Sequence, residues 1–400
     1  MKVGVFKKGR NLPRVKADNL AVVVQALRKL QPIARTTLAD VTGLTAATIT
    51  NMVDELSDLD LVVERPSEER QVGRRPTLLT LNRDRGQVIG VEISRSRVRV
   101  VRSNFGGDVL ARVERPFKPG AVKRNLAQIK DVISEVAGGP NLLGIGVGVP
   151  GPVSSALGLV VSPPNFGAWQ NVELAETLGE AFGVRCWLDD DAKTAAFGEA
   201  WYGAGQNVST LLYISLRSGI GAGLIVNDRV YRGTHELAGE IGHTTIHVDG
   251  PLCECGNRGC VETLVSVPAI LLEARRLGLD VPDLETLRSL ADAGEARAVQ
   301  VRERTHTYLT ATLLNAVNHY DPDVIVLGGQ LVAAWPDLTE ALAAKVKGRS
   351  FGFLSKDVRI EPSMLGKDAT ALGGVALVID QVLRDPHGVL KPVEHVESAD

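Results

Sequence analysis

The sequence predicts an α/β protein with two domains: a small, mainly helical N-terminal domain over about residues 1–82 and a larger α/β domain over 83–400. Three observations predict this division. Apolar residues repeat at helical spacing up to about residue 56. From Gln87 onward, β-rich segments alternate with helical ones. The 400 residues, of which 44% are hydrophobic, are too many for one simple core and enough for two or three compact units.

Composition limits the classes of function. The formal net charge of −2 argues against a surface that is basic all over, so any nucleic-acid interface must be local. The sequence has no apolar run of about eighteen residues or more, and its first residues are charged where a secretory signal would be apolar. We therefore expect a cytoplasmic protein with no membrane partner.

The N-terminal domain begins with an amphipathic helix over 18–30, and two shorter helices follow. The second helix is predicted to start at Thr36 or Thr37, to bury Leu38 and Val41 and to end at Gly43, because glycine tolerates the left-handed conformation of a helix C-terminus. A third helix is predicted after Thr45. Its outward residues at and near the N-terminal end are expected to face DNA: Thr45, Ala46, Thr48, Thr50 and Asn51.

Two short strands, 61–64 and 78–81, follow the third helix, and a charged loop that contains Arg74 and Arg75 joins them. This arginine pair is suited to a phosphate or to a narrow minor groove. Helices, turn and strand pair together are typical of a winged helix-turn-helix domain. A protein–protein module is the alternative for a three-helix unit, but the agreement of turn, wing and arginines favours DNA binding.

The larger domain is predicted to have two lobes. Its first part contains three strands over 87–117, a helix over 122–136 and a strand over 142–149, the order found in the first lobe of the actin-like, sugar-kinase fold. A further strand leads directly into Asp189, Asp190 and Asp191. Three adjacent acids are costly to hold together unless a ligand or cation uses them, although acids at a helix N-terminus are also favourable.

The second lobe is predicted to start with a strand over 211–216 and a hairpin over 223–233. A mainly helical block follows and leads to a buried strand that ends at Gly328-Gly329. We expect the first lobe to comprise about residues 86–204 plus 369–384, and the second about 208–368.

Three of the four cysteines of the chain are close together: Cys253, Cys255 and Cys260. Thiolates at this spacing fit a structural zinc site, in which Zn²⁺ takes four nitrogen or sulfur ligands. His243 and His247 are both candidates for the fourth ligand. A disulfide or a redox pair is the alternative, but three cysteines cannot all pair and the chain is otherwise poor in cysteine.

The run Gly239-Glu240-Ile241-Gly242-His243, followed by the pattern CxCGxxGCxE, resembles the signature of the ROK family, which comprises sugar kinases and sugar-responsive transcriptional repressors. The resemblance implies that His243 is the fourth zinc ligand and that its other ring nitrogen touches the sugar. It also implies a two-lobed actin-like (ribonuclease-H-like) sugar-kinase fold over most of residues 86–384. The N-terminal domain resembles the DNA-binding half of ROK repressors, which ROK kinases lack.

The resemblance further implies where a sugar binds. In the family, the sequence Asn-Asp-Ala-Asn includes the aspartate that accepts the sugar hydroxyl proton in kinases, and this residue is Asp191 here. The two Asn positions are Asp190 and Lys193, which predicts a changed sugar preference, because a carboxylate only accepts hydrogen bonds. The residues implied to hold the sugar are Asn165, Asp190, Asp191, Glu240, His243 and Glu262.

The two phosphate-binding turns of ROK kinases are altered in this sequence. The family's Asp-x-Gly-Gly-Thr is Glu92-Ile93-Ser94-Arg95-Ser96 here, and its Gly-Thr-Gly is Arg217-Ser218-Gly219. Only Gly328-Gly329, where adenosine would approach, is kept. Such glycine turns are needed to direct backbone N–H groups at ATP phosphates. Arg95 and Arg217 either bind a phosphate of the ligand or, as we expect, form salt bridges to one of the aspartates.

The sequence therefore predicts a repressor without catalytic activity that holds a structural Zn²⁺, binds operator DNA as a homodimer or homotetramer, and leaves the operator when a sugar or sugar phosphate binds. The rival hypothesis is an ROK-type sugar kinase with an appended DNA-binding domain. A zinc-dependent scaffold without a ligand is a third.

Overall fold

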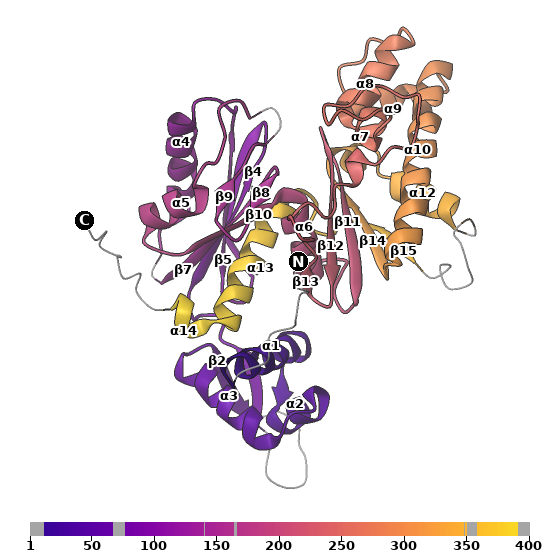
Figure 1. The fold of residues 1–400 in the computed structure, drawn as a ribbon. Helices are drawn as coiled ribbons and strands as arrows, with labels where there is room; N and C mark the ends of the chain where they lie inside the picture. The colour runs from indigo at the N-terminus through magenta and orange to yellow at the C-terminus, as the bar shows by residue number, and fades with distance from the viewer. Residues whose placement is uncertain are drawn as a thin grey trace, which may run out of the picture.

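The protein consists of an N-terminal domain and two lobes, each lobe built on a five-stranded sheet (Figure 1). None of the helices among the described residues is both long and apolar enough to cross a lipid bilayer. The computed structural model describes residues 12–66, 77–139, 141–163, 166–347, 349 and 358–390.

The N-terminal domain packs three helices on a small antiparallel sheet with strand order β1-β3-β2. Leu27, Leu38, Ile49 and Leu56 are fully buried between these helices and the sheet. The elements of this domain are α1 (Leu12–Leu30), β1 (Ile33–Ala34), α2 (Arg35–Thr42), α3 (Ala46–Asp58), β2 (Val62–Pro66) and β3 (Thr77–Leu81).

The caps of these helices follow the prediction in part. Gly43 ends α2 with a left-handed φ of 68°, and the side chain of Thr45 accepts a hydrogen bond from the N–H of Thr48 at the start of α3. The predicted start of α2 is wrong: its N-cap is Ala34, because β1 pairs with β3 and holds the chain extended up to that residue. Val41 was predicted to be buried but is 53% exposed, because only Leu38 of this helix lies in the core.

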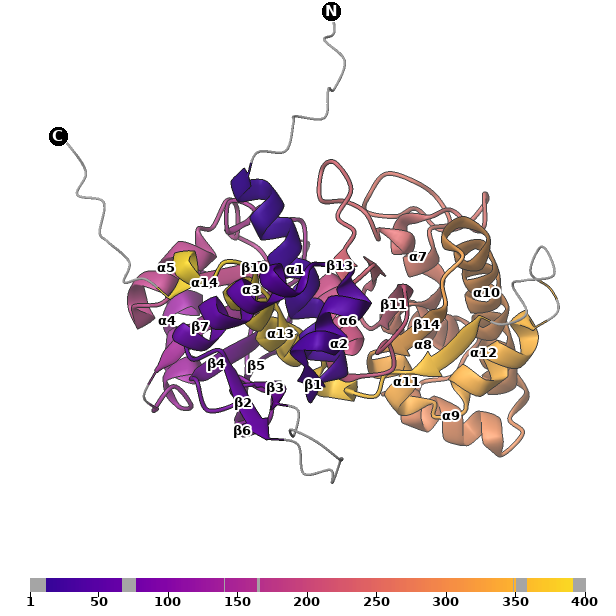
Figure 2. The same cartoon turned by 90° about the horizontal axis from the view of Figure 1, so that it is seen from below.

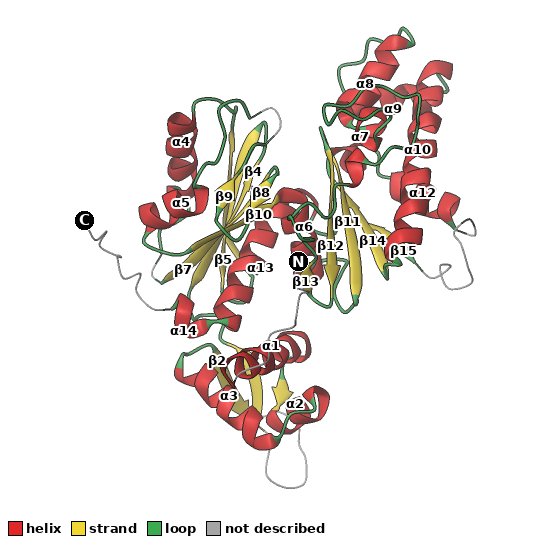
Figure 3. Ribbon diagram, in the orientation of Figure 1, coloured by secondary structure: helices red, strands yellow, loops and turns green. Residues whose placement is uncertain are grey.

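Lobe 1 has a mixed sheet of strand order β10-β7-β4-β5-β6, in which β10, β7 and β4 run parallel. Helices α4 and α5 cover its outer face, whereas α6 and α13 lie between the two lobes (Figure 3). The elements are β4 (Gln87–Ile93), β5 (Arg97–Asn104), β6 (Val109–Pro116), α4 (Val122–Ser134), β7 (Leu142–Val149), β8 (Val153–Ser154), β9 (Leu159–Val160), α5 (Leu174–Phe182), β10 (Cys186–Asp190), α6 (Asp191–Tyr202), η3 (Gly366–Asp368), α13 (Ala369–Arg384) and α14 (Pro386–Val389).

Glycines allow α13 to approach the sheet of lobe 1 closely. A Cβ atom at Gly90 would collide with the carbonyl oxygen of Ala371, and one at Gly146 would collide with that of Gly374. Strand and helix can therefore touch through their backbones only because these positions carry no side chain. This contact fixes a helix from near the end of the chain on strands from its first half.

Lobe 2 has a sheet of strand order β13-β12-β11-β14-β15, and a block of helices covers its outer face (Figure 1). Strands β11, β14 and β15 run parallel. The elements are β11 (Thr210–Leu216), β12 (Ile220–Val226), β13 (Arg229–Val230), η1 (Ile241–His243), α7 (Val261–Val265), α8 (Val267–Arg276), α9 (Leu284–Asp292), α10 (Ala296–Tyr320), β14 (Val324–Gly328), α11 (Gln330–Ala334), α12 (Leu338–Val346) and β15 (Arg359–Pro362).

Candidate functional site

The carboxyl ends of the parallel strands of the two lobes meet across a cleft. In lobe 1, Glu92 of β4 pairs with Gly148 of β7 in register, and Asp190 of β10 pairs with the neighbouring Val149. An ion pair of 2.5 Å joins Glu92 to Arg217, which follows β11 of lobe 2. Clefts at strand carboxyl ends are the usual ligand sites of open α/β sheets.

The three aspartates at the end of β10 have different surroundings. Asp189 is buried, and its carboxylate forms an ion pair with Arg232 of lobe 2, with 2.5 Å between the guanidinium nitrogen and the carboxylate oxygen. The Oδ1 atom of Asp190 accepts hydrogen bonds from the N–H groups of Ala192 and Lys193, at 3.0 and 3.2 Å, and so caps α6. The sequence allowed two interpretations of the three acids: a ligand or cation site, or acids that stabilise a helix N-terminus. The second interpretation explains the position of Asp190.

Asp191 is the first residue of α6, and among the described residues its carboxylate has no hydrogen bond from another side chain. Burial raises its pKa, although the nearby Arg217 acts in the opposite direction. Burial also raises the pKa of Asp190, and the Asp191 carboxylate adds to that rise. An ionised carboxylate only accepts hydrogen bonds, whereas a carboxyl group that keeps its proton also donates one, so this pair can both accept from and donate to the hydroxyl groups of a ligand.

The other predicted sugar-binding residues come from lobe 2 and from a loop of lobe 1. Glu240 is exposed and its charge reaches Asp190, which places it near the aspartates. One carboxylate oxygen of Glu262 accepts the N–H of Ile220 at 2.9 Å and thereby holds the turn between β11 and β12. Asn165 lies outside the described residues.

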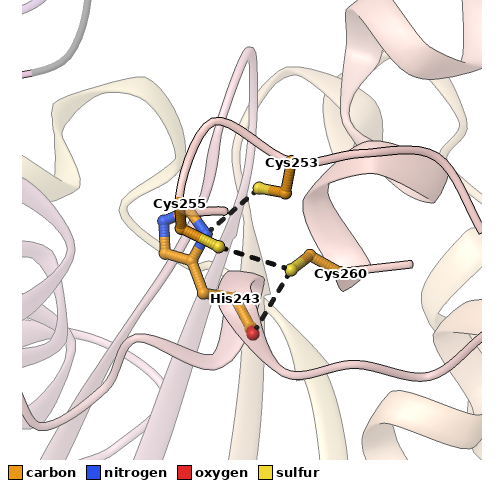
Figure 4. A group of neighbouring side chains, drawn as sticks. All are labelled: His243, Cys253, Cys255 and Cys260. Atoms are coloured by element: carbon orange, nitrogen blue, oxygen red, sulfur yellow. Dashed lines mark hydrogen bonds between the residues drawn. The ribbon is translucent and has the colours of Figure 1, made fainter. Parts of the chain in front are cut away.

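His243, Cys253, Cys255 and Cys260 form a cluster whose ligand atoms all lie within 4.8 Å of one another (Figure 4). The Cys255 and Cys260 sulfurs are 3.7 Å apart, and the Cys253 sulfur is 3.5 Å from Nδ1 of His243. In a tetrahedral zinc site with Zn–S bonds of about 2.3 Å, two sulfurs are about 3.8 Å apart. The cluster therefore has the donors and the spacing to hold a metal ion.

The geometry of the cluster also decides between the two histidines that the sequence left open. His243 directs Nδ1 at the cluster, whereas His247 contributes no atom to it. The backbone carbonyl oxygen of His247 instead accepts the N–H of Gly250, and its ring lies 6.1 Å from that of Tyr308. With Nδ1 committed to the cluster, Nε2 of His243 is the ring nitrogen left for another partner.

A second part of the cleft lies where the two altered turns meet. A cavity of about 460 Å³ opens here, and it is lined by residues that include Ser94, Arg95, Arg217, Gly328 and Lys367. Arg217 forms a salt bridge, as expected, but its partner is Glu92 and not one of the aspartates, because Glu92 lies near the carboxyl end of β4, across the cleft from Arg217. Arg95 has no ion pair within the described part of the chain, although its charge acts on Asp191.

Sequence reasoning missed Arg99, which is 3% exposed and organises this part of the cleft. Arg99 lies opposite Glu92 in the β4–β5 register, pairs with it at 2.7 Å, and also pairs with Glu114 at 2.5 Å. The sequence did contain an indication of this role, because an arginine and a glutamate at matching positions of two apolar strands indicate a cross-strand ion pair.

The predicted DNA-facing residues lie at the free surface of the N-terminal domain. Thr45, Ala46, Thr50 and Asn51 are exposed at the start of α3, and Thr48 is half-buried. Arg74 and Arg75 lie outside the described residues.

Comparison with known proteins gives these features a family context. The ROK family model matches residues 88–381. The chain is 31% identical over 395 residues to the xylose repressor of Caldicellulosiruptor bescii, covering 93% of this chain and 98% of the repressor. It is 26% identical to the glucokinase of Thermotoga maritima, which is matched over 98% of its length but covers only 74% of this chain.

Solved structures agree with the sequence comparison. A ROK family transcriptional regulator, described as a homologue of the Escherichia coli MLC protein, superposes with a TM-score of 0.80 at 27% identity and covers 93% of this chain and 97% of its own. The match therefore includes the N-terminal domain as well as both lobes. From the extent of the family match and the repressor relative, the chain belongs to the ROK family.

Proposed function

We propose that this protein is a sugar-responsive transcriptional repressor whose cleft binds a sugar and does not phosphorylate it. The observation that carries the proposal is the Glu92–Arg217 ion pair, which joins the two turns that would cradle ATP phosphates in a kinase. A repressor relative and a regulator structure that each cover 93% of this chain support the same conclusion.

The absence of kinase activity follows from the chemistry of the altered turns. Phosphate cradles need backbone N–H groups that approach the oxygens closely, which glycine permits. Here Ser94 closes its turn by hydrogen bonds with Arg97, and the Arg217 guanidinium is held by Glu92. A Mg²⁺–ATP complex would have to displace this ion pair and would lack the magnesium-holding aspartate, whose place Glu92 occupies.

Sugar binding rests on the other part of the cleft. We assign the sugar to Asn165, Asp190, Asp191, Glu240, His243 and Glu262, with Asp191 in the position of the kinase base. The cluster of His243, Cys253, Cys255 and Cys260 would hold a structural Zn²⁺ that orients the His243 ring toward the sugar. Arg95, near Asp191 and without an ion pair among the described residues, would accommodate a phosphate if the effector carries one.

DNA binding rests on the N-terminal domain. We assign Thr45, Ala46, Thr48, Thr50 and Asn51 of α3 to the major groove, and Arg74 and Arg75 to the backbone or the minor groove. A homodimer or homotetramer would present two such domains to half-sites about one helical turn apart. Closure of the lobes on a sugar would change the spacing of the two domains and release the operator.

The test is fluorescence anisotropy of the protein on a labelled DNA fragment from upstream of its own gene, with glucose, xylose, mannose, N-acetylglucosamine and their phosphates. We expect one compound to weaken binding about 5- to 150-fold. An Asn51→Ala variant should bind the fragment weakly with and without that compound, whereas Asn315→Ala, at an exposed position of α10, should behave as wild type. Tight binding that no compound changes, or consumption of ATP with any of the sugars, would contradict the proposal.

A further inference from the structure

Helix α1 of the N-terminal domain contacts both lobes at once. Figure 2, the view from below, shows the N-terminal domain against α6 and α13, at the boundary between the lobes. Its contact with lobe 2 is the side chain of Asp228, in the turn between β12 and β13. Its contact with lobe 1 runs along α6 and α13, with Arg28 facing Trp201 and within electrostatic reach of Asp380.

Asp228 is the centre of this contact. It is only 8% exposed, and its carboxylate pairs with Arg28 at 3.0 Å and with Lys29 at 2.6 Å, and also accepts a hydrogen bond from Gln25. The Arg28 guanidinium also lies over the Trp201 ring, 4.4 Å from its centroid. A carboxylate with three donors from one helix fixes the position of that helix far more strongly than an exposed surface ion pair would.

Two elements lead from this contact to the predicted sugar-binding aspartates. The first is α6, which starts at Asp191 and carries Trp201 about 15 Å further along its axis. The second is the short segment after the β12–β13 turn, in which Asp228 holds α1 and Arg232, four residues later, holds Asp189. Both elements meet at Arg28, one through the ring of Trp201 and the other through Asp228.

From this arrangement we propose that Asp228 is a positioning residue: it ties the DNA-binding domain to lobe 2 so that a movement of the cleft is transmitted to α1 through Arg28. Because α1 also rests on α13, which packs on strands β4 and β7 of lobe 1, a change in the angle between the lobes would move Asp228 relative to α13. The α1 helix must then follow Asp228 or lose its ion pairs. This inference rests on the proposed function, since it supplies the connection between sugar binding and operator binding.

The test uses Asp228→Asn in the full-length protein, with Asp292→Asn as the matched control. Asp292 pairs with Arg302 at 2.6 Å on the helices of lobe 2, far in the fold from the N-terminal domain, so the same chemical change is made away from α1. A second variant, Arg28→Lys, keeps a charge for Asp228 but removes the planar group that lies over Trp201. Each protein is titrated with the labelled upstream DNA fragment, with and without the sugar of the panel that affects the wild type most.

The quantity to compare is the operator Kd with sugar divided by the operator Kd without sugar. We expect Asp228→Asn to lower this ratio at least about five-fold, toward one, while the Kd for the sugar itself changes less than about two-fold. Arg28→Lys should lower the ratio by a smaller factor, and Asp292→Asn should leave it unchanged. An unchanged ratio in Asp228→Asn would overturn the inference while leaving the proposed function intact.

Hydrogen–deuterium exchange of the same proteins, without DNA or sugar, tests the contact itself. Loss of charge-assisted hydrogen bonds should raise the exchange rate of peptides from 19–30 by about ten-fold or more in Asp228→Asn, with peptides from α10 unaffected. Unchanged protection of α1 would show that Asp228 does not position it. If no sugar changes the operator Kd of the wild type, the proposed function is wrong. The inference that Asp228 transmits sugar binding to α1 is then wrong as well, even if amide exchange of α1 is faster in Asp228→Asn.

Discussion

The two ends of the cleft are built from the same strand ends but have opposite chemistry. At the end to which we assign the sugar, here called the sugar end, Asp190 and Asp191 are adjacent half-buried acids, and the pKa of each is raised. At the other end, arginines dominate, and Glu92 is 2% exposed between Arg99 and Arg217. The sugar end keeps acceptors that a ligand can use, whereas the charges of the other end are largely paired with one another.

Under the function proposed above, this difference shows how sugar binding and phosphoryl transfer can be separated in one fold. Sugar recognition needs carboxylates and an oriented histidine, and these can persist when catalysis is absent. Phosphoryl transfer needs space and backbone N–H groups at the phosphates. In this chain Ser94 and Arg95 stand at the two glycines of the first turn, and Arg217, at the first glycine of the second turn, pairs with Glu92. The space and the N–H groups that phosphates need are thereby lost, while the ion pair joins the lobes across the cleft.

The largest effect is expected from replacing one side chain of the cluster of His243, Cys253, Cys255 and Cys260, which we propose to hold Zn²⁺ beside the sugar. Cys255→Ser should abolish tight zinc binding and loosen the segment 243–260, because a structural zinc site contributes folding free energy directly. The sugar Kd should rise by about 100-fold or more, since His243 would lose its orientation and outer-shell orientation is worth about 10–100-fold by itself. Zinc content by metal analysis and sugar binding by calorimetry measure both.

The matched control is Cys186→Ser. Cys186 is a partly buried thiol of β10 outside the cluster, so its replacement should leave zinc content and sugar affinity as in the wild type. Normal sugar binding by Cys255→Ser protein that contains no zinc would separate the metal from sugar recognition.

The next effect concerns the arginine-rich end. Glu92→Gln removes the carboxylate that Arg99 and Arg217 share and should lower the free energy of unfolding by about 3 kcal/mol, because breaking a buried pair leaves a charge uncompensated. Sugar affinity should change little. Glu114→Gln, which removes the exposed partner of Arg99, should cost less than about 1 kcal/mol.

Urea unfolding of the two glutamate variants measures the difference in stability. Equal stability of Glu92→Gln and wild type would mean that the ion pair across the cleft does not hold the lobes. Binding of Mg²⁺–ATP by the wild type, measured by calorimetry, would remove the distinction between the two ends of the cleft.

Much of this fold could be predicted because its signals are local. The spacing of Leu38, Ile49 and Leu56, the glycine at 43 and the threonine at 45 define the helices of the N-terminal domain, and the structure has them there. The cysteine spacing predicted a cluster with the donors for a metal ion, and the family resemblance indicated His243, which the structure brings to the three sulfurs. The start of α2 could not be predicted, because it depends on the pairing of β1 with β3, in which Ile33 pairs with Leu79 and Ala34 with Leu78.

The contacts between distant segments could not be predicted from the sequence either, because each contact depends on residues far apart in the chain. Nothing near Asp228 in the chain indicates that it pairs with Arg28, 200 residues earlier. The partner of Arg217 was assigned to an aspartate, and the structure has Glu92 instead, 125 residues away. A sequence predicts that a buried charged residue has a partner, but the identity of the partner depends on how the lobes pack.

The smallest effect returns to the sugar end and depends on pH. Burial raises the pKa of Asp190 above its ordinary value of about 3.9, with Asp191 adding to the rise. Between that value and the raised pKa, the folded protein keeps a proton that the unfolded chain has released. Folding stability from this group is therefore complete below about pH 4 and is lost as the pH rises through the raised pKa.

Asp190→Asn removes this dependence, and an asparagine oxygen can still accept the N–H groups that start α6. We expect the variant and the wild type to be similarly stable near pH 4. Between pH 4 and the raised pKa of Asp190, the free energy of unfolding of the variant should increase relative to that of the wild type, by at most about 1.4 kcal/mol per pH unit. Urea unfolding at a series of pH values gives this difference, and Asp292→Asn serves as the exposed control. A difference that stays constant with pH would mean that Asp190 is ionised in the folded protein, and the sugar end would then be charged in the same way as an exposed acidic surface.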